Sequence, residues 1–167
     1  MNSAIESMLS RRSVRQFSGA PVGQEDIELM LRAGMAAPTG MNLQPWAFII
    51  VTDRRRMDAL REALPYAKML DKAGAAIVVC GDGSAHHWVE DCSAAAENVL
   101  LAAHALGYGA VWTAAYPYED RIAAVRKECA IPNAYLPLCV IPVGVPNDAA
   151  GAAKDKYKPG NIHRNVW

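Results

Sequence analysis

Two basic clusters stand near opposite ends of the sequence. The first is Arg11-Arg12-Ser13-Val14-Arg15, and the second is Lys154-Asp155-Lys156-Tyr157-Lys158. A phosphate dianion is bound by several charge-assisted hydrogen bonds, which arginine, lysine and a neighbouring serine hydroxyl can donate. Together the clusters predict a phosphate site, although each cluster alone is typical of a solvated helix end or tail.

The stretch APTGMNLQPW, residues 37–46, carries a hydroxyl and two amides between two prolines. Thr39, Asn42 and Gln44 can donate and accept hydrogen bonds, and Pro38 restricts the backbone that carries them. The same composition is typical of an ordinary loop between a helix and a strand. By itself it therefore identifies no ligand.

Several other kinds of catalytic site lack their sequence patterns. No G-x-G-x-x-G joins a strand to a helix and no Walker A motif is present, which argues against a Rossmann site and a P-loop. No serine lies in a G-x-S-x-G context. His86 and His87 are adjacent and face different directions, and His104 lies in an apolar helix, so we expect no metal site. The possibility that remains is a bound cofactor that carries its own reactivity.

Composition limits the partners. The 167 residues predict one domain, and 17 basic residues balance 17 acidic ones, so no global field attracts nucleic acid or membrane. No apolar run reaches the ~20 residues of a membrane helix, and the N-terminus lacks signal-peptide features, so we expect a cytoplasmic protein. The cysteines form no C-x-x-C pair and are expected to be buried free thiols: Cys80, Cys92, Cys129 and Cys139.

Hydrophobic periodicity predicts the elements that carry these residues. Helices are expected near 5–9, from about 27 to 37, after an Asp53 cap through 64, over about 86–106 and over 119–129. Strands are expected over 46–51, 75–80, 109–115 and 136–145. The strands are apolar on both faces, which predicts helices on both sides of the sheet, in a three-layer α/β or α+β sandwich. Pro137 and Pro142 place the last strand at an edge, at an end or at a bulge.

The helix expected over about 86–106 has almost no polar face and should be buried all round. Its many alanines permit close approach of another helix, and we expect it to form the core of a two-fold dimer contact. The tail, about residues 150–167, ends with apolar Ile162 and Trp167. We therefore expect the tail to dock, for example on another subunit.

Five motifs together resemble the FMN-dependent nitroreductases in their small single-domain form. They are RRSVRQF, APTGMNLQPW, YAKML, ENVLLAAHALGYGAVW and KDKYKPGNIHRNVW, in the family's order and spacing over essentially the whole chain. The resemblance implies an α+β fold with a central, mostly antiparallel sheet between helices. It also implies an intertwined homodimer with two FMN sites at its interface, and a C-terminal extension exchanged between subunits.

The resemblance implies that the two basic clusters meet at the FMN phosphate. Arg11 and Ser13 would hold the phosphate and ribityl chain, and Lys156 and Lys158 would close on the phosphate. Arg12 matches a more variable position of the family.

The resemblance also implies which residues contact the ring. Arg15 and Lys68 would approach its pyrimidine edge, where a cation ~4 Å from the developing negative charge contributes ~4 kcal/mol at an effective dielectric of 20. Pro38, Thr39 and Asn42, with Gln44 shaping their loop, would reach the flavin from the partner subunit.

The chain departs from some relatives beside flavin N5. Ala114 and Ala115 replace a Glu-Gly pair there, so a backbone N–H can still donate but a glutamate side chain has no counterpart. Candidates for the pocket wall are Tyr66, Met69, Trp88, Tyr116 and Tyr118. Aromatic residues, however, more often belong to a core or an interface than to a site.

The leading hypothesis is an oxidoreductase with a ping-pong mechanism. NADH or NADPH reduces FMN and leaves, and an electron-poor acceptor such as a nitroaromatic or a quinone takes its place. Two alternatives stay open: a specialised flavoenzyme of the same fold, such as a reductive dehalogenase or a flavin-consuming enzyme, and a non-catalytic flavin-binding dimer. The sequence does not name the acceptor or the preferred nicotinamide.

Overall fold

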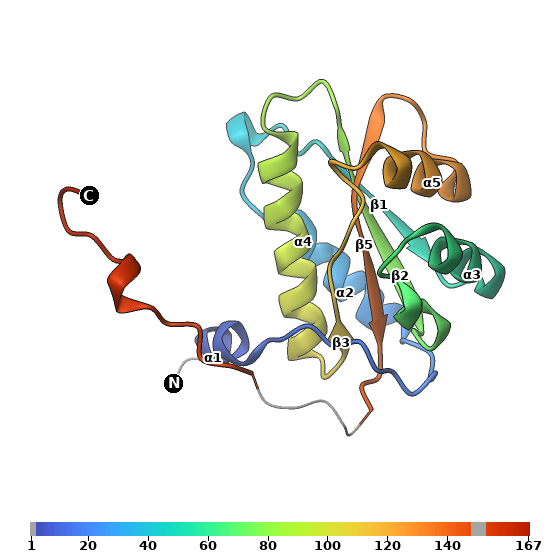
Figure 1. The fold of residues 1–167 in the computed structure, drawn as a ribbon, viewed down its shortest axis with the longest axis horizontal. Coiled ribbons are helices and arrows are strands. Elements are labelled where there is room, and N and C mark those ends of the chain that lie inside the picture. Colours follow the sequence, from blue (N-terminus) through green and yellow to red (C-terminus); the bar gives the residue numbers. More distant parts are fainter. Residues whose placement is uncertain (1–2, 148–152) are drawn as a thin grey trace.

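The structure is a computed structural model that describes residues 3–147 and 153–167 (Figure 1). The helices are α1 (Ser3–Ser10), α2 (Gln24–Met35), α3 (Arg54–Ala63), α4 (Trp88–Ala105) and α5 (Glu119–Cys129). The strands are β1 (Trp46–Val51), β2 (Ala75–Asp82), β3 (Gly109–Ala110), β4 (Thr113–Ala114) and β5 (Tyr135–Gly144). Three short 3-10 helices are η1 (Gly40–Asn42), η2 (Lys68–Asp71) and η3 (Pro159–Asn161).

All described strand pairs in the sheet are antiparallel, in the order β1-β2-β5-β3, and β4 also pairs with β5. Helices α2 and α4 cover one face, and α3 and α5 cover the other (Figure 1). Each face has its own buried cluster, because the strand side chains are apolar on both sides. The prediction of a three-layer α+β sandwich is confirmed.

Strand β5 is central, so the prediction of an edge position is wrong, whereas that of a bulge is confirmed. The register with β2 shifts between Val79 and Cys80, which leaves an extra residue, Leu138, next to Pro137. The strand predicted over 109–115 is split into β3 and β4, and the break lies beside Pro142. A proline cannot donate to a neighbouring strand, so both prolines lie where the ladder is irregular.

In the single chain helix α4 is not buried all round, and burial of its open side by a second subunit stays a prediction. Its core side is buried at Cys92 and Val99, but Glu97, Asn98 and Leu101 are only half-buried. A hollow of about 240 Å³ runs between this side and α1, whose apolar side chains include the 56% exposed Met8. This partly open side is the surface of α4 that remains for the predicted contact with another subunit.

The segment 11–17 packs against the sheet through two glycines. Val14 N donates to Ala110 O at 3.0 Å, and both Val14 and Phe17 are buried. Gly109 and Gly144 face each other across β3 and β5. A Cβ on Gly109 would lie 2.6 Å from Val14 Cγ1, and one on Gly144 would lie 3.0 Å from the Phe17 ring. The segment can therefore approach the strands because they carry no side chain there.

The four cysteines are free thiols, three of them buried. Burial raises the pKa of Cys80 and of Cys92 to about 12. Within residues 3–147 and 153–167, no helix is both long enough and apolar enough to cross a bilayer.

Candidate functional site

The first basic cluster lies in the segment that contacts β3, where Val14 N donates to Ala110 O. Val14 is buried, while Ser13 and Arg15 on either side are exposed. Phe17 is buried as well, whereas Arg11 and Arg12 are both half-buried. The segment therefore exposes Ser13 and Arg15, two of the residues that the resemblance assigns to the flavin.

Arg11 is partly engaged within the chain. Its Nε lies 3.0 Å from Glu97 Oε1 of α4, and its side chain is 20% exposed. A guanidinium group carries five N–H donors, so one carboxylate leaves donors for a second anion. Glu97 is a partner that the sequence analysis missed, because no local spacing relates it to Arg11.

The second basic cluster meets the first beside α1. A hollow of about 530 Å³ is lined by Met8 and Leu9, by Arg11, and by residues 153–157, which include Lys156. Lys158 follows and is exposed, and the tail then runs away from the body (Figure 1). The structure therefore brings Arg11 and Lys156 together across a long sequence separation.

Arg15 and Lys68 line one hollow of about 290 Å³. Arg15 comes from the extended segment and Lys68 begins η2, and Met69 and Asp71 of the same turn also line the hollow. The two cations that the resemblance assigns to one edge of the ring thus face the same space. Because both side chains are exposed, they remain accessible to a ligand.

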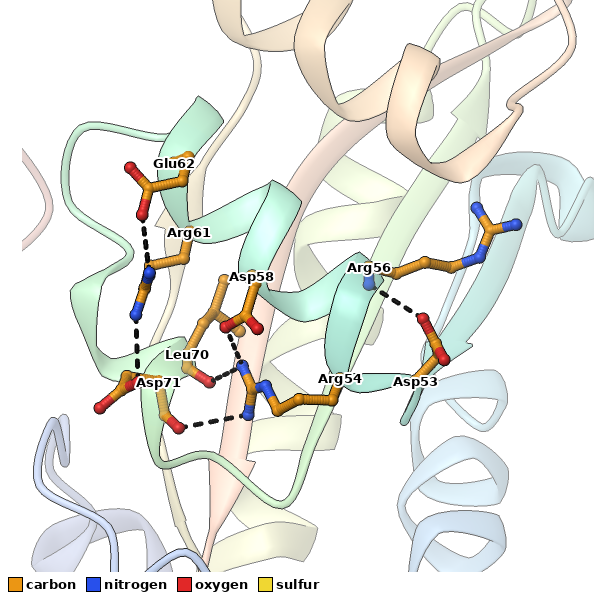
Figure 2. Close-up of polar contacts among 8 residues, drawn as sticks. All are labelled: Asp53, Arg54, Arg56, Asp58, Arg61, Glu62, Leu70 and Asp71. Carbon is orange, nitrogen blue, oxygen red and sulfur yellow. Dashed lines mark hydrogen bonds and ion pairs between the residues drawn. The ribbon is translucent and has the colours of Figure 1, made fainter.

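Two arginines of α3 hold η2 in place (Figure 2). Arg54 Nη2 donates to Leu70 O at 2.6 Å and lies 3.1 Å from Asp58 Oδ1, and its Nη1 donates to Asp71 O at 3.2 Å. Arg61 Nη1 donates to Asp71 Oδ1 at 3.0 Å. The last carbonyls of a helix have no partner within it, so Arg54 caps η2.

The sequence analysis missed Arg54 and Arg61, because a charged run such as RRRMDALRE is typical of a solvated helix face. The available signal was local and weak, namely the i,i+4 spacing of Arg54 and Asp58. The predicted cap was correct, since Asp53 Oδ1 accepts from Arg56 N at 3.0 Å. The contacts with η2 depend on the tertiary structure.

In the loop 37–45, the polar side chains bond mainly to one another. Gln44 N donates to Thr39 Oγ1 at 3.2 Å, and Gln44 Nε2 donates to Asn42 Oδ1 at 3.0 Å. Two contacts tie the loop to the body: Gly40 N donates to Oδ1 of the buried Asp91 at 3.0 Å, and Asp82 N donates to Pro45 O at 2.9 Å. The loop is thus anchored at the start of α4.

The backbone of this loop is strained. Met41, Asn42 and Gln44 have φ angles of 52°, 55° and 49°. The left-handed region costs roughly 1–2 kcal/mol for a residue with a side chain. Pro38, Asn42 and Gln44 are also exposed. Such strain is typical of segments whose conformation serves a ligand or a partner.

The loop and the segment 11–17 lie at opposite ends of α4 (Figure 1). The loop is anchored to Asp91 in the first turn of the helix, whereas Ser10 Oγ is bonded to His104 Nε2 in the last turn at 2.8 Å. These turns are about 20 Å apart along the axis, from the 1.5 Å rise per residue. One chain therefore does not bring Asn42 next to Arg15.

One of the backbone donors expected beside flavin N5 already has a partner within the chain. Ala115 N donates to Leu138 O at 3.0 Å, so this donor is already engaged within the chain. The physical reason is the bulge at Leu138, whose carbonyl accepts from Ala115. Ala114 O accepts from Arg121 Nη1 at 3.4 Å.

The aromatic candidates divide into two groups. Trp88 is buried and packs edge to face on Tyr116 with ring centroids 4.9 Å apart, so this pair belongs to the core. Tyr66 and Tyr118 are exposed and flank Arg121, whose Cζ lies 5.7 Å and 3.8 Å from their ring centroids. Arg121 was not singled out in the sequence, because cation–π partners cannot be read from spacing.

Known proteins resemble this chain over its whole length. Residues 8–65 and 58–145 match the family model described as "Nitroreductase family". The "Putative NADH dehydrogenase/NAD(P)H nitroreductase" of Archaeoglobus fulgidus is 42% identical over 174 residues, which cover 100% of both chains. A crystal structure under the same name from Parabacteroides distasonis has 51% identity and a TM-score of 0.96, and covers 100% of both chains. An FMN-dependent nitroreductase from Clostridium difficile is 28% identical with a TM-score of 0.92, over 98% of this chain and 99% of that one.

Proposed function

Because the chain belongs to the nitroreductase family and is a flavin-dependent oxidoreductase, we propose that it passes electrons from NADH or NADPH through FMN to electron-poor acceptors such as nitroaromatics or quinones. The observation that carries this proposal is the hollow shared by Arg15 and Lys68, two cations from distant parts of the chain. A ring that becomes negatively charged on reduction is the ligand that such a pair would favour.

The side chains present fit FMN. Arg11, Lys156 and the Ser13 hydroxyl form the donor set for a phosphate dianion at one end of the segment. Arg15 and Lys68 offer positive charge further along. Along the chain, Arg11 comes first, then the Ser13 hydroxyl, then Arg15. The parts of FMN that they would contact follow in the same order: the phosphate, the ribityl chain and the ring.

In this mechanism the chain binds and orients the cofactor, and FMN, when bound, supplies the hydride and electron transfer. Arg11, Ser13 and Lys156 fix the phosphate and hence the position of the ring. Arg15 and Lys68 would hold positive charge near the ring, where a cation ~4 Å from the developing negative charge contributes ~4 kcal/mol at an effective dielectric of 20. The proposal assigns no acid or base to the protein and gives no role to the engaged Ala115 donor.

We further propose that the working protein is a homodimer of one-domain subunits, with the loop 37–45 of each subunit completing the other's site. This follows from the separation of Asn42 and Arg15 along α4. The partly open side of α4 and the apolar α1 offer the surface for a two-fold contact. Pro38, Thr39, Asn42 and Gln44 would then reach the flavin across that contact.

The C-terminal tail has a candidate docking place on a second subunit. Ile162 is 53% exposed and Trp167 is 98% exposed, and β1 is the free edge of the sheet with Ile50 at 46% exposure. A hollow of about 600 Å³ lies beside this edge, lined by Ile27 and Leu31 among others. Docking there would cover both apolar surfaces. Residues 150–152, the start of the predicted tail, lie outside the described residues.

The deciding experiment combines flavin binding with steady-state kinetics. We expect purified protein to bind FMN and to oxidise NADH or NADPH when a quinone is added. Absence of FMN binding contradicts the proposal. FMN binding without NAD(P)H consumption would instead identify a flavin-binding dimer, and loss of the flavin itself under oxygen would identify a flavin-consuming enzyme.

A further inference from the structure

Lys68 and Asp71 occupy the two ends of η2, three residues apart. Side chains at i and i+3 of a 3-10 helix are eclipsed, so the ammonium and the carboxylate are natural partners for an ion pair. Both residues line the hollow that contains Arg15. An ion pair between them would place a negative charge beside the flavin edge and neutralise Lys68.

The structure shows Asp71 engaged elsewhere. Its Oδ1 accepts from Arg61 Nη1 at 3.0 Å, so the carboxylate is turned toward α3 (Figure 2). Over residues 3–147 and 153–167, no carboxylate lies within ion-pair distance of Lys68. Arg54 holds the η2 backbone through its carbonyls, which leaves the Asp71 side chain to Arg61.

We propose that Arg61 is a positioning residue that keeps Asp71 from pairing with Lys68, so that the ammonium group stays available to the flavin. This inference rests on the proposed function, because it assigns Lys68 to the flavin edge. Arg61 itself lies on α3 and lines a different hollow with Lys68 and Asp71, on the α3 side of η2. Its effect on the ligand is therefore indirect.

The first test measures FMN binding at low ionic strength by quenching of flavin fluorescence. We expect Arg61→Gln to weaken binding about threefold to fivefold, the range expected of an exposed ion pair. The effect should shrink in high salt, because exposed charges are screened. The midpoint potential of bound FMN should become more negative, since a cation is withdrawn from the ring that gains charge.

The decisive variant is Arg61→Gln/Asp71→Asn. With no carboxylate to capture Lys68, FMN affinity should return to within about twofold of wild type. A purely structural role for Arg61 gives no such rescue, because Asp71→Asn does not replace the lost contact. In a Lys68→Met background, Arg61→Gln should have a smaller effect on affinity than in wild type, because there is no ammonium group left to neutralise.

Arg56 provides a matched control on the same helix. It donates to Glu128 O at 2.7 Å, and Figure 2 shows its side chain directed away from η2. Arg56→Gln removes an arginine without releasing Asp71, so FMN affinity should not change. A melting temperature for each variant shows that the protein is folded.

A second measurement uses the flavin-free protein and mass spectrometry. Release of Asp71 in Arg61→Gln should slow acylation of the Lys68 amine by an amine-reactive ester several-fold, with Lys127 on α5 as the internal reference. Asp71→Asn in the same chain should restore the rate. If wild type binds no FMN, the proposed function fails, and this labelling still decides the inference. Unchanged labelling in Arg61→Gln, or weakened FMN binding without rescue by Asp71→Asn, overturns it.

Discussion

The turns η1 and η2 are both short 3-10 helices, and both carry side chains that the resemblance assigns to the flavin, yet the chain holds them very differently. In η2, Leu70 is fully buried and Arg54 and Arg61 bond to the turn from α3. In η1, the side chain of Met41 is 83% exposed, and the loop bonds chiefly to itself.

The difference also appears in the backbone. Three residues of the η1 loop have positive φ, whereas none in η2 does. Strain of this kind persists only where the surroundings or a ligand compensate for it. The chain thus holds the turn that carries Lys68 through contacts of its own, whereas the strained loop at η1 is bonded chiefly to itself. This is the arrangement expected if the loop serves a second subunit.

The largest effect is expected in a mixed dimer, which tests the comparison between η1 and η2. Asn42→Asp places a carboxylate beside a ring that must become negative, and Arg11→Ala removes a phosphate donor. If the loop acts on the partner's flavin, a dimer of one chain of each kind has one site with both lesions and one with neither. Affinity-tagged mixed dimers should therefore recover about half of the wild-type activity, whereas each homodimer has two damaged sites.

The two homodimers serve as the reference for that experiment. A mixed dimer that is shown to form but has no more activity than they have would place the loop and Arg11 on the same flavin in cis. The difference between η1 and η2 would then not indicate that the loop serves a second subunit.

A smaller effect is expected for Arg11→Ala alone. The loss of a charged hydrogen bond to the phosphate should weaken FMN binding by about 2–3 kcal/mol. Riboflavin, which has no phosphate, should bind almost as before, and isothermal titration of both flavins measures the difference. Equal losses for the two ligands would show that Arg11 supports the fold through Glu97 instead of binding the phosphate.

The next prediction tests how much the contacts between α3 and η2 contribute to stability. Arg54→Met should lower the free energy of unfolding by about 1–2 kcal/mol, because the Leu70 and Asp71 carbonyls lose their charged donor. Urea unfolding of the flavin-free protein measures this change in the free energy of unfolding. The exposed neighbour Arg55 is the control, and Arg55→Met should change stability by less than about 0.5 kcal/mol. Equal effects of the two substitutions would mean that the capping contacts contribute little.

The smallest effect is expected in η1, with the opposite sign. Met41→Gly relieves a positive φ of 52°, and we expect a gain of roughly 0.5 kcal/mol in the free energy of unfolding, because the added flexibility of the unfolded chain offsets part of the relief. Leu43→Gly is the control, since Leu43 has a φ of −71° and no strain to relieve. A loss of stability at Met41 comparable to that at Leu43 would argue that the loop stores no strain.

Local signals in the sequence predicted much of the fold. The apolar run 46–51 follows a proline and precedes the Asp53 cap, and β1 has those bounds. Helix α5 likewise matches the predicted 119–129. The two-sided burial of β2 and β5 follows from their continuous apolar composition. Each of these features is decided by neighbours in the sequence.

The features that the sequence did not reveal depend on distant residues. Pro142 is allowed in a central strand because the neighbouring ladder is interrupted between β3 and β4. The bond between Ala115 N and Leu138 O follows from a bulge in another strand. The contacts of Arg54 and Arg61 with η2 join two elements whose relative position no periodicity encodes. For the candidate site, residue types were readable and their mutual placement was not.

The glycine pair beneath the segment 11–17 has a consequence for efforts to evolve this protein toward new acceptors. Neither Gly109 nor Gly144 is among the residues assigned to the ligand, so a library that randomises everything except the site would include them. A Cβ at Gly109 would lie 2.6 Å from Val14 Cγ1, so any larger residue there should displace the segment that carries Ser13 and Arg15. A selection for activity would remove variants at these two positions as it removes variants at Arg15, because both kinds of change disturb the placement of the Arg15 side chain. We therefore expect substitutions at Gly109 and Gly144 to be as restricted as substitutions in the proposed site.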